Sequence, residues 1–174
     1  MKRFLLLFAV MFIAGLCVNA QTNQPPCSTE QARQFDFWVG TWNLEWADAK
    51  GTKLSGTNTI TKILNGCAIE ENFSTAGSSP FIGKSLSLFD ARNGRWKQTW
   101  VDNAGAYLDF VGEFKDGKMT LSREAVNPQG KKIMQRMVFS EIKKDSIRWD
   151  WESSVDDGKT WTSNWQLNYK RKTS

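Results

Sequence analysis

The feature that most constrains the fold is a nearly continuous alternation of apolar and polar residues, which begins near residue 41 and runs almost to the C-terminus. A period of two is typical of β-strands that bury one face. The alternation predicts ten strands separated by short segments of turn-forming residues. Their expected ranges are 41–46, 54–63, 67–74, 82–90, 95–101, 106–115, 118–126, 131–142, 146–153 and 160–170.

The connections between these strands have the composition of hairpin turns. Asn93-Gly94 and Asp116-Gly117 are strong signals for tight turns, and segments 127–130 and 156–158 predict longer ones. Strands joined in this way form an antiparallel meander, which protects its edges best by closing on itself. We therefore predict an all-β, antiparallel up-and-down barrel of about ten strands, with an open sandwich as the alternative.

Apolar residues fall on one face of each predicted strand, as a barrel with a non-aqueous interior requires. Four such sets are Trp42, Leu44 and Trp46; Leu108, Phe110, Gly112 and Phe114; Ile147, Trp149 and Trp151; and Trp161, Trp165, Leu167 and Tyr169. Polar residues interrupt other apolar faces, namely Glu71, Lys84, Gln98 and Arg123. In the eighth strand the face is ambiguous between Gln135 and Arg136. Because buried polar groups must be paired, Glu71 is expected to pair with Arg123 or Arg136, unless these residues lie at exposed strand ends. Alternatively, these polar residues orient a carboxylate or hydroxyl group of a ligand.

The N-terminus has the organisation of a signal peptide. Lys2 and Arg3 precede an apolar run, residues 4–16, that is too short to span a membrane, and residues 18–20 offer small side chains for cleavage. We predict removal of residues 1–20 after Ala20, a polar lead at 21–27 and a single domain at 28–174. The mature chain would then be secreted or periplasmic, with no membrane span.

Cysteine use agrees with export. Cys17 leaves with the signal peptide, so that Cys27 and Cys67 remain in an oxidising compartment, where a disulfide is the expected state and two unconnected thiols are the alternative. Residues near Ser28 and Gln31 resemble a capping box. They predict a short helix that ends near Phe37 and closes one end of the barrel.

Composition excludes several functions. The chain has no histidine, which removes haem ligation by histidine, the common zinc sites and histidine-dependent nucleophilic catalysis. No glycine-rich phosphate loop follows a strand. The net charge of +5 is scattered, so no nucleic-acid partner is expected. We predict no metal site, no cofactor and no catalytic residue.

Gly40-Thr41-Trp42, at the first strand after a short helix, resembles the opening signature of the lipocalin and calycin barrels. The resemblance implies that Trp42 packs across the barrel floor beneath Arg171 or Lys170. The longer string at 35–42, with segments 94–96, 98–100 and 149–152, resembles an uncharacterised family of exported bacterial proteins regarded as lipocalin-like. That family carries no agreed catalytic residues.

A second, local resemblance lies at residues 154–161, which are similar to the Asp-box hairpin found in sialidases and several unrelated β proteins. It implies a structural role for Ser154, Asp156, Gly158, Thr160 and Trp161, and no sialidase chemistry.

The nine tryptophans suggest either a packed aromatic core or an aromatic-lined pocket. Our leading hypothesis is a binding protein for a small apolar or amphipathic molecule. In it, Trp42 closes the floor, Trp96, Trp100, Trp149 and Trp151 line the wall, and Glu71, Gln98, Arg123 and Arg136 give polar specificity. The alternatives are a cofactor-free isomerase or decarboxylase in which buried Glu71 acts as a base, and a cell-envelope protein-interaction module.

Overall fold

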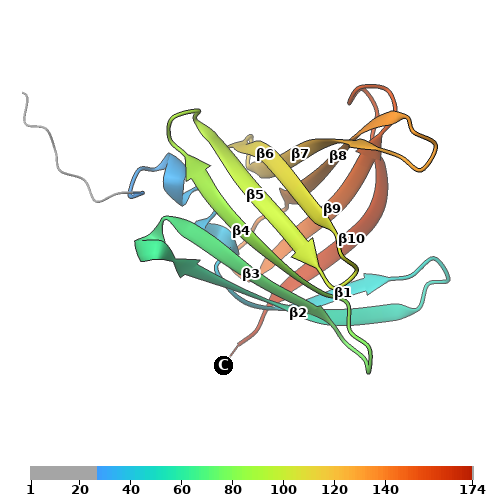
Figure 1. Cartoon of the computed structure of the whole chain (residues 1–174). Helices are drawn as coiled ribbons and strands as arrows, with labels where there is room; N and C mark the ends of the chain where they lie inside the picture. The colour runs from blue at the N-terminus through green and yellow to red at the C-terminus, as the bar shows by residue number, and fades with distance from the viewer. Residues whose placement is uncertain (1–26, 174) are drawn as a thin grey trace, which may run out of the picture.

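Ten strands form a closed barrel in the computed structural model, which describes residues 27–173 (Figure 1). The predicted signal peptide and residues 21–26 of the polar lead lie outside the described residues. The strands are β1 (Gly40–Ala47), β2 (Lys53–Ile63), β3 (Ala68–Thr75), β4 (Ile82–Asp90), β5 (Arg95–Asp102), β6 (Tyr107–Lys115), β7 (Lys118–Val126), β8 (Lys132–Ser140), β9 (Ser146–Ser154) and β10 (Thr162–Arg171).

Every strand pairs antiparallel with the strand that precedes or follows it, and β1 pairs with β10 to close the barrel. At the closure, Trp42 lies opposite Arg171 and Leu44 lies opposite Tyr169. The predicted fold class, an all-β up-and-down barrel of ten strands, is therefore confirmed. Predicted and observed strands differ mainly at their ends.

Two short 3-10 turns replace the predicted N-terminal helix. They are η1 (Gln31–Arg33) and η2 (Asp36–Trp38), and they lie at one end of the barrel (Figure 1). A 3-10 turn aligns residues three apart. Phe35, which precedes η2, and Trp38, which ends it, can therefore both enter the barrel, where they are almost fully buried. The expected continuous helix to Phe37 is thus corrected to two turns that supply aromatic side chains to the core.

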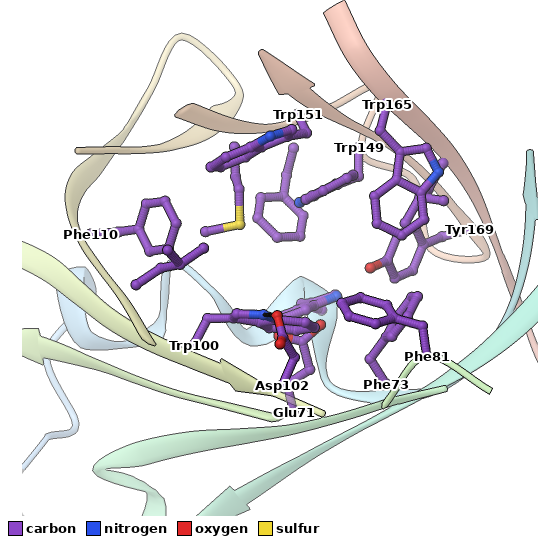
Figure 2. Close-up of a pocket in the computed structure, with 15 residues that line it drawn as sticks. Glu71, Phe73, Phe81, Trp100, Asp102, Phe110, Trp149, Trp151, Trp165 and Tyr169 are labelled. Atoms are coloured by element: carbon purple, nitrogen blue, oxygen red, sulfur yellow. Dashed lines mark hydrogen bonds between the residues drawn. The ribbon is translucent and has the colours of Figure 1, made fainter. Parts of the chain in front are cut away.

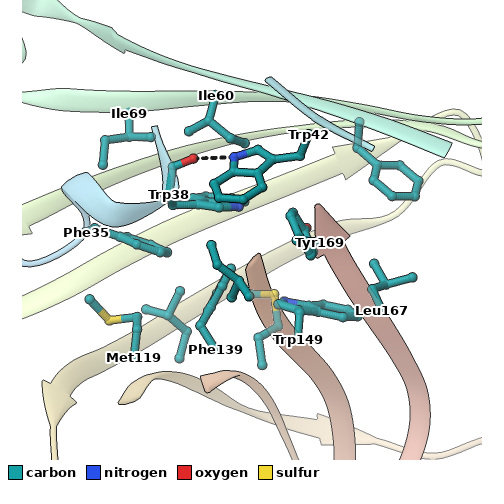
Figure 3. Close-up of a cluster of buried hydrophobic side chains, with 14 of the residues drawn as sticks. Phe35, Trp38, Trp42, Ile60, Ile69, Met119, Phe139, Trp149, Leu167 and Tyr169 are labelled. Atoms are coloured by element: carbon teal, nitrogen blue, oxygen red, sulfur yellow. Dashed lines mark hydrogen bonds between the residues drawn. The ribbon is translucent and has the colours of Figure 1, made fainter. Parts of the chain in front are cut away.

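Part of the buried core packs at this end of the barrel, where Phe35, Trp38, Trp42, Trp96 and Phe139 form a cluster that we call the floor (Figure 3). The rings of Phe35 and Trp38 stack 4.9 Å apart, and both contact Phe139 edge-on. Trp96 also meets Phe35 edge-on, at 5.4 Å. Such offset and edge contacts are the favoured arrangements of aromatic rings. The floor is consequently solid.

The Gly-x-Trp signature has a direct structural explanation at the floor. The guanidinium of Arg171 lies 4.0 Å from the centre of the Trp42 ring, as the sequence resemblance implied. Gly40 has φ +134°, and a Cβ atom there would stand 2.3 Å from Nη1 of Arg171. Trp42 donates a hydrogen bond from Nε1 to the backbone oxygen of Trp38, at 2.7 Å. The positive φ favours glycine at this position, and a side chain there would displace the guanidinium from Trp42.

A disulfide joins Cys27 to Cys67, as predicted. Cys67 follows η3 (Leu64–Gly66), the short turn between β2 and β3. The bond thus fastens the start of the described chain to the wall of the barrel.

The alternation assigned one face of β4, with Ile82, Lys84 and Leu86, and also Trp161 to the interior, whereas they lie outside. Lys84 lies on the exposed face of β4, while Gly83, Ser85 and Ser87 point inward. Trp161 lies outside the barrel, because the β9–β10 register shifts between Ser163 and Trp165. A β-bulge of this kind inverts the face of every residue before it.

Candidate ligand-binding cavity

A cavity of about 200 Å³ lies above the floor, inside the barrel (Figure 2). Aromatic and aliphatic side chains from both sides of the barrel surround it, and the polar groups on it are few. The lining residues are Trp38, Glu71, Phe73, Phe81, Trp100, Asp102, Leu108, Phe110, Met137, Phe139, Trp149, Trp151, Trp165, Leu167 and Tyr169.

Trp100 forms one wall of the cavity and is held from two sides. Its ring lies flat over Gly83 on the neighbouring strand, where a Cβ atom would come within 2.0 Å of the indole. Its Nε1 donates a hydrogen bond to Oδ2 of Asp102, at 2.9 Å. A glycine on β4 and a carboxylate on β5 together fix the orientation of this tryptophan.

Asp102 is at the end of β5 and also organises the turn that follows. Its Oδ1 accepts hydrogen bonds from the backbone N–H groups of Ala104 and Ala106. Desolvation raises the pKa of Asp102, but the hydrogen bonds from Trp100, Ala106 and Ala104 outweigh that effect and hold the pKa below its usual value. Asp102 therefore carries a negative charge at neutral pH.

Glu71, on β3, is a buried carboxyl group on the cavity wall. Its Oε1 accepts a hydrogen bond from Nδ2 of Asn58 and its Oε2 accepts one from Oγ of Ser85, each at 2.6 Å. Desolvation raises its pKa to about 7, against the opposing effect of these two hydrogen bonds. Glu71 thus titrates near neutral pH.

The hydrogen bonds of Glu71 continue into a polar cluster behind the cavity wall. Nε2 of Gln98 donates to Oγ of Ser85 at 3.2 Å and to Oγ of Ser87 at 2.9 Å. All of these side chains are buried. The cluster makes the barrel interior polar where it is bounded by β3, β4 and β5, whereas the rest of the interior is mostly apolar.

Tyr169, on β10, brings a hydroxyl group to the same region, and Figure 2 shows it pointing into the cavity. The tyrosine oxygen accepts a hydrogen bond from Nδ2 of Asn58, at 3.1 Å. Burial, followed by the negative charge of Glu71, raises the pKa of Tyr169 above its usual value. Tyr169 therefore remains neutral at physiological pH.

Four of the nine predicted ligand-binding residues line the cavity, namely Glu71, Trp100, Trp149 and Trp151. Two others, Trp42 and Trp96, belong to the floor. Gln98 lies behind the wall, in the polar cluster.

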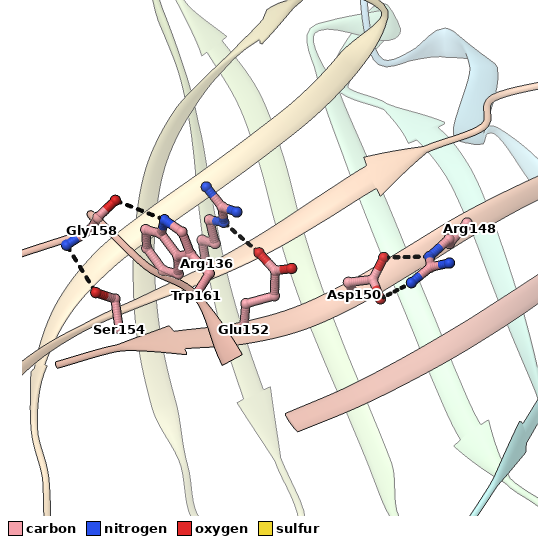
Figure 4. Close-up of polar contacts among 7 residues, drawn as sticks. All are labelled: Arg136, Arg148, Asp150, Glu152, Ser154, Gly158 and Trp161. Carbon is pink, nitrogen blue, oxygen red and sulfur yellow. Dashed lines mark hydrogen bonds and ion pairs between the residues drawn. The ribbon is translucent and has the colours of Figure 1, made fainter. Parts of the chain in front are cut away.

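The two predicted arginines lie elsewhere. Arg123 points inward on β7, where it donates to Oε1 of Gln135 at 2.6 Å and lies 6.0 Å from the centre of the Phe110 ring. Arg136 is on the outer face, paired with Glu152 (Figure 4). The expected pairing of Glu71 with either arginine is therefore wrong. The strand β3, which carries Glu71, pairs with β2 and β4. The strands β7 and β8, which carry the two arginines, lie several strands away around the barrel.

Other lining residues escaped sequence reasoning. The alternation places Phe110, Trp165 and Tyr169 on apolar faces. It does not indicate how far along the barrel axis each of them lies. The register of the closed barrel brings three further residues to the same height along the barrel axis. They are Phe73 on β3, Phe81 just before β4 and Asp102 at the end of β5. The signal that could have found Asp102 is its spacing of two from Trp100, which places both on one face.

The predicted Asp-box residues form a compact turn on the outside of the barrel (Figure 4). Asp156 accepts hydrogen bonds from the hydroxyl of Ser154 and from both the N–H and the hydroxyl of Thr160. Gly158 has φ +81°, and its oxygen accepts a hydrogen bond from Nε1 of Trp161. Trp161 in turn stacks 3.9 Å from the guanidinium of Arg136. This cluster is remote from the cavity interior.

Among residues 27–173, no group of three or more Cys, Asp or Glu side chains could hold a metal ion. The same part of the chain contains no helix that is both long and apolar enough to cross a membrane.

The fold and the cavity define the class of the protein, a closed ten-strand antiparallel β-barrel with an aromatic-lined interior. Residues 29–171 match the family described as "Protein of unknown function (DUF1579)", and the chain belongs to this family. No curated protein matches the chain.

A solved structure with some similarity is a protein of unknown function from the DUF3598 family of Nostoc punctiforme PCC 73102. It is 10% identical and the match covers 83% of this chain and 100% of that chain. The TM-score is 0.26, so this similarity carries no argument about fold or function.

Proposed function

We propose that the protein is an exported, lipocalin-like carrier that binds one small apolar or amphipathic molecule in the aromatic cavity. The observation that carries this proposal is the cavity itself, which is open above a solid floor and has Glu71 and Tyr169 as its deep polar groups. Small-molecule sites have this character, being mostly apolar with a few placed polar groups.

The size of the cavity supports a compact ligand. Cavities of about 150 Å³ lined by apolar side chains stay dry and take up benzene or xenon. At about 200 Å³, this one suits a molecule built on one ring or two fused rings. An empty space of that size among tryptophans would forfeit many dispersion contacts, which a ligand restores.

Export is supported by two features. The Cys27–Cys67 disulfide belongs to an oxidising compartment. The basic and apolar segments at residues 1–16 have the order of a signal peptide. A secreted or periplasmic carrier is the simplest account of both.

An enzyme on the same barrel is the second candidate, and the pKa of Glu71 favours it. A carboxyl group poised near pH 7 is suited to general acid–base catalysis of a cofactor-free isomerisation or decarboxylation. Turnover would then depend on pH with an apparent pKa near 7 and would vanish in Glu71→Gln. The third possibility, a protein-interaction module, predicted a fully packed interior and is disfavoured by the cavity.

Binding of 2-naphthol, followed by titration calorimetry, tests the carrier proposal. Trp100→Ala and Trp151→Ala remove opposite walls of the cavity, and each should weaken binding at least tenfold while the β spectrum in circular dichroism is retained. Trp161→Ala is the matched control, because Trp161 lies outside the barrel, and its affinity should equal that of the wild type. Equal affinity in all four proteins would overturn the proposal, as would the failure of both 2-naphthol and the phenyl-substituted probes named below to bind.

A further inference from the structure

We infer that the ligand is a protonated amine, with its ammonium group against Glu71 and its apolar part among Trp100, Trp149 and Trp151. This inference rests on the proposed function and names the chemical class that the cavity selects. Four features of the cavity support it, namely the partners of Glu71, the unpaired acceptors around it, the charges on the lining and the arrangement of the rings.

Glu71 is a buried carboxylate whose hydrogen-bond donors are neutral. Asn58 and Ser85 each donate one hydrogen bond, one to each oxygen, and no lysine or arginine of the described chain forms an ion pair with it. A carboxylate oxygen accepts two hydrogen bonds, so each retains a free position. Burying a carboxylate without a cation is costly. A ligand ammonium group would supply both the missing charge and the missing donors.

Hydrogen-bond acceptors are in excess around this carboxylate. Within residues 27–173, Oδ1 of Asn58 and Oε1 of Gln98 are buried without a donor, against one cavity-lining donor, Nε1 of Trp38, that is buried without an acceptor. The hydroxyl oxygen of Tyr169 lies next to the same asparagine. An ammonium group carries three N–H donors and no acceptor, which is the complement of such a region.

The charges on the cavity lining select against anions. The lining holds two carboxyl groups, Glu71 at depth and Asp102 at the end of β5, and it includes no lysine or arginine. The third titratable group on it is Tyr169 from β10, which remains neutral. The charged groups on the lining itself are therefore acidic, and the inward-facing cation of β7, Arg123, is held by Gln135 beside the Phe110 ring.

Aromatic rings meet at right angles around the cavity. The planes of Trp149 and Trp165 are 88° apart with centroids separated by 5.6 Å, and those of Phe73 and Trp165 are 88° apart at 5.9 Å. Rings arranged in this way present faces as well as edges to the enclosed space. Such cages recognise organic cations through the negative faces of the rings.

Calorimetry with three matched probes tests the inference, namely 2-phenylethylamine, 2-phenylethanol and 3-phenylpropanoate. At pH 8 the amine should bind at least tenfold more tightly than the alcohol, and the acid should not bind. The affinity for the amine should fall as the pH is lowered from 8 to 6, because Glu71 titrates near pH 7 and a protonated carboxyl group cannot pair with ammonium. The amine itself stays protonated over this range, since aliphatic amines titrate near pH 10.

Glu71→Gln should remove the preference for the amine and its pH dependence, and leave the affinity for the alcohol within about threefold. Glu113→Gln is the matched control, because Glu113 is exposed on the outer face of β6 and pairs with Arg95. That variant should retain the full preference for the amine.

The outcomes separate this inference from the function on which it rests. Equal or tighter binding of the alcohol, or an amine preference that survives in Glu71→Gln, would overturn the amine assignment. If 2-naphthol still binds with the expected sensitivity to Trp100→Ala, the carrier function stands without the amine. If neither 2-naphthol nor any of the three probes binds, both are overturned.

Discussion

Single residues set the chemistry of this barrel, and Glu71 has the largest effect among them. It is enclosed by β2 and β4, and its carboxylate receives hydrogen bonds only from an amide and a hydroxyl group. Its neutral form is consequently favoured in the folded chain and its charged form in the unfolded chain. The pKa of about 7 in the fold, against 4.5 in the absence of burial, makes stability depend on pH.

Stability should therefore fall as the pH rises from 5 to 8. The contribution of neutral Glu71 is fully present below its unfolded pKa and is lost as the pH rises through its folded pKa. At about 1.4 kcal/mol per pKa unit, the loss amounts to at most about 3 kcal/mol. No histidine is present to titrate in the same range, so the slope belongs mainly to this residue.

Urea unfolding of Glu71→Gln at pH 5, 6, 7 and 8 measures this effect. The variant should show an almost flat profile because glutamine does not titrate. It should still fold, since Asn58 can rotate its amide and offer Oδ1, which has no donor in the described structure, to the new amide. Glu113→Gln should keep the wild-type slope. A slope unchanged in Glu71→Gln would contradict the assignment of the titration.

Elements of the barrel were predictable wherever local chemistry determines them. Turn residues and alternation located all ten strands because each strand buries one face. The prediction of which β4 residues face inward was wrong for a physical reason. Large side chains on β5, Trp100 and Gln98, fill the space inside β4, so small residues such as Gly83 and Ser85 must point inward there. An assignment based on hydrophobicity alone therefore placed the inward-facing residues of β4 on the outside.

Other errors at the scale of elements have equally local causes. The bulge before Trp165 inserts one residue into β10, and no composition signal announces it. The predicted short N-terminal helix is present as two 3-10 turns and is interrupted at Phe35, which has φ −100° and ψ 6° and is buried in the floor together with Trp38. Tertiary packing overrode the helical pattern.

The Cys27–Cys67 disulfide should be a major contributor to the stability of the N-terminal segment and of the barrel. It closes a loop with a sequence separation of 40 residues, which corresponds to about 4 kcal/mol in the chain-entropy description. Cys27→Ser combined with Cys67→Ser should lower the free energy of unfolding by about that amount, as measured in urea. Dithiothreitol should destabilise the wild type equally and leave the double variant unchanged; equal stability of the two proteins would contradict this role.

At the scale of the whole molecule, closure of the barrel creates the site. Residues from β3, β5, β6, β9 and β10 meet around one space only because β1 pairs with β10. Sequence reasoning found the tryptophans and Glu71. It could not find how far along the barrel axis they lie relative to one another, since that depends on the register between strands. It also could not separate the floor, where Trp42 and Trp96 pack, from the cavity above it.

The central claim is that this space holds a small molecule, and mass spectrometry of the exported, mature protein tests it most directly. The protein is measured in its native state, then after denaturation, both as isolated and after incubation with 2-phenylethylamine and 2-naphthol. Our account predicts one bound molecule per chain in the native spectrum, lost on denaturation, and a smaller bound fraction in Trp100→Ala. A native mass equal to that of the bare chain under all three conditions would contradict it.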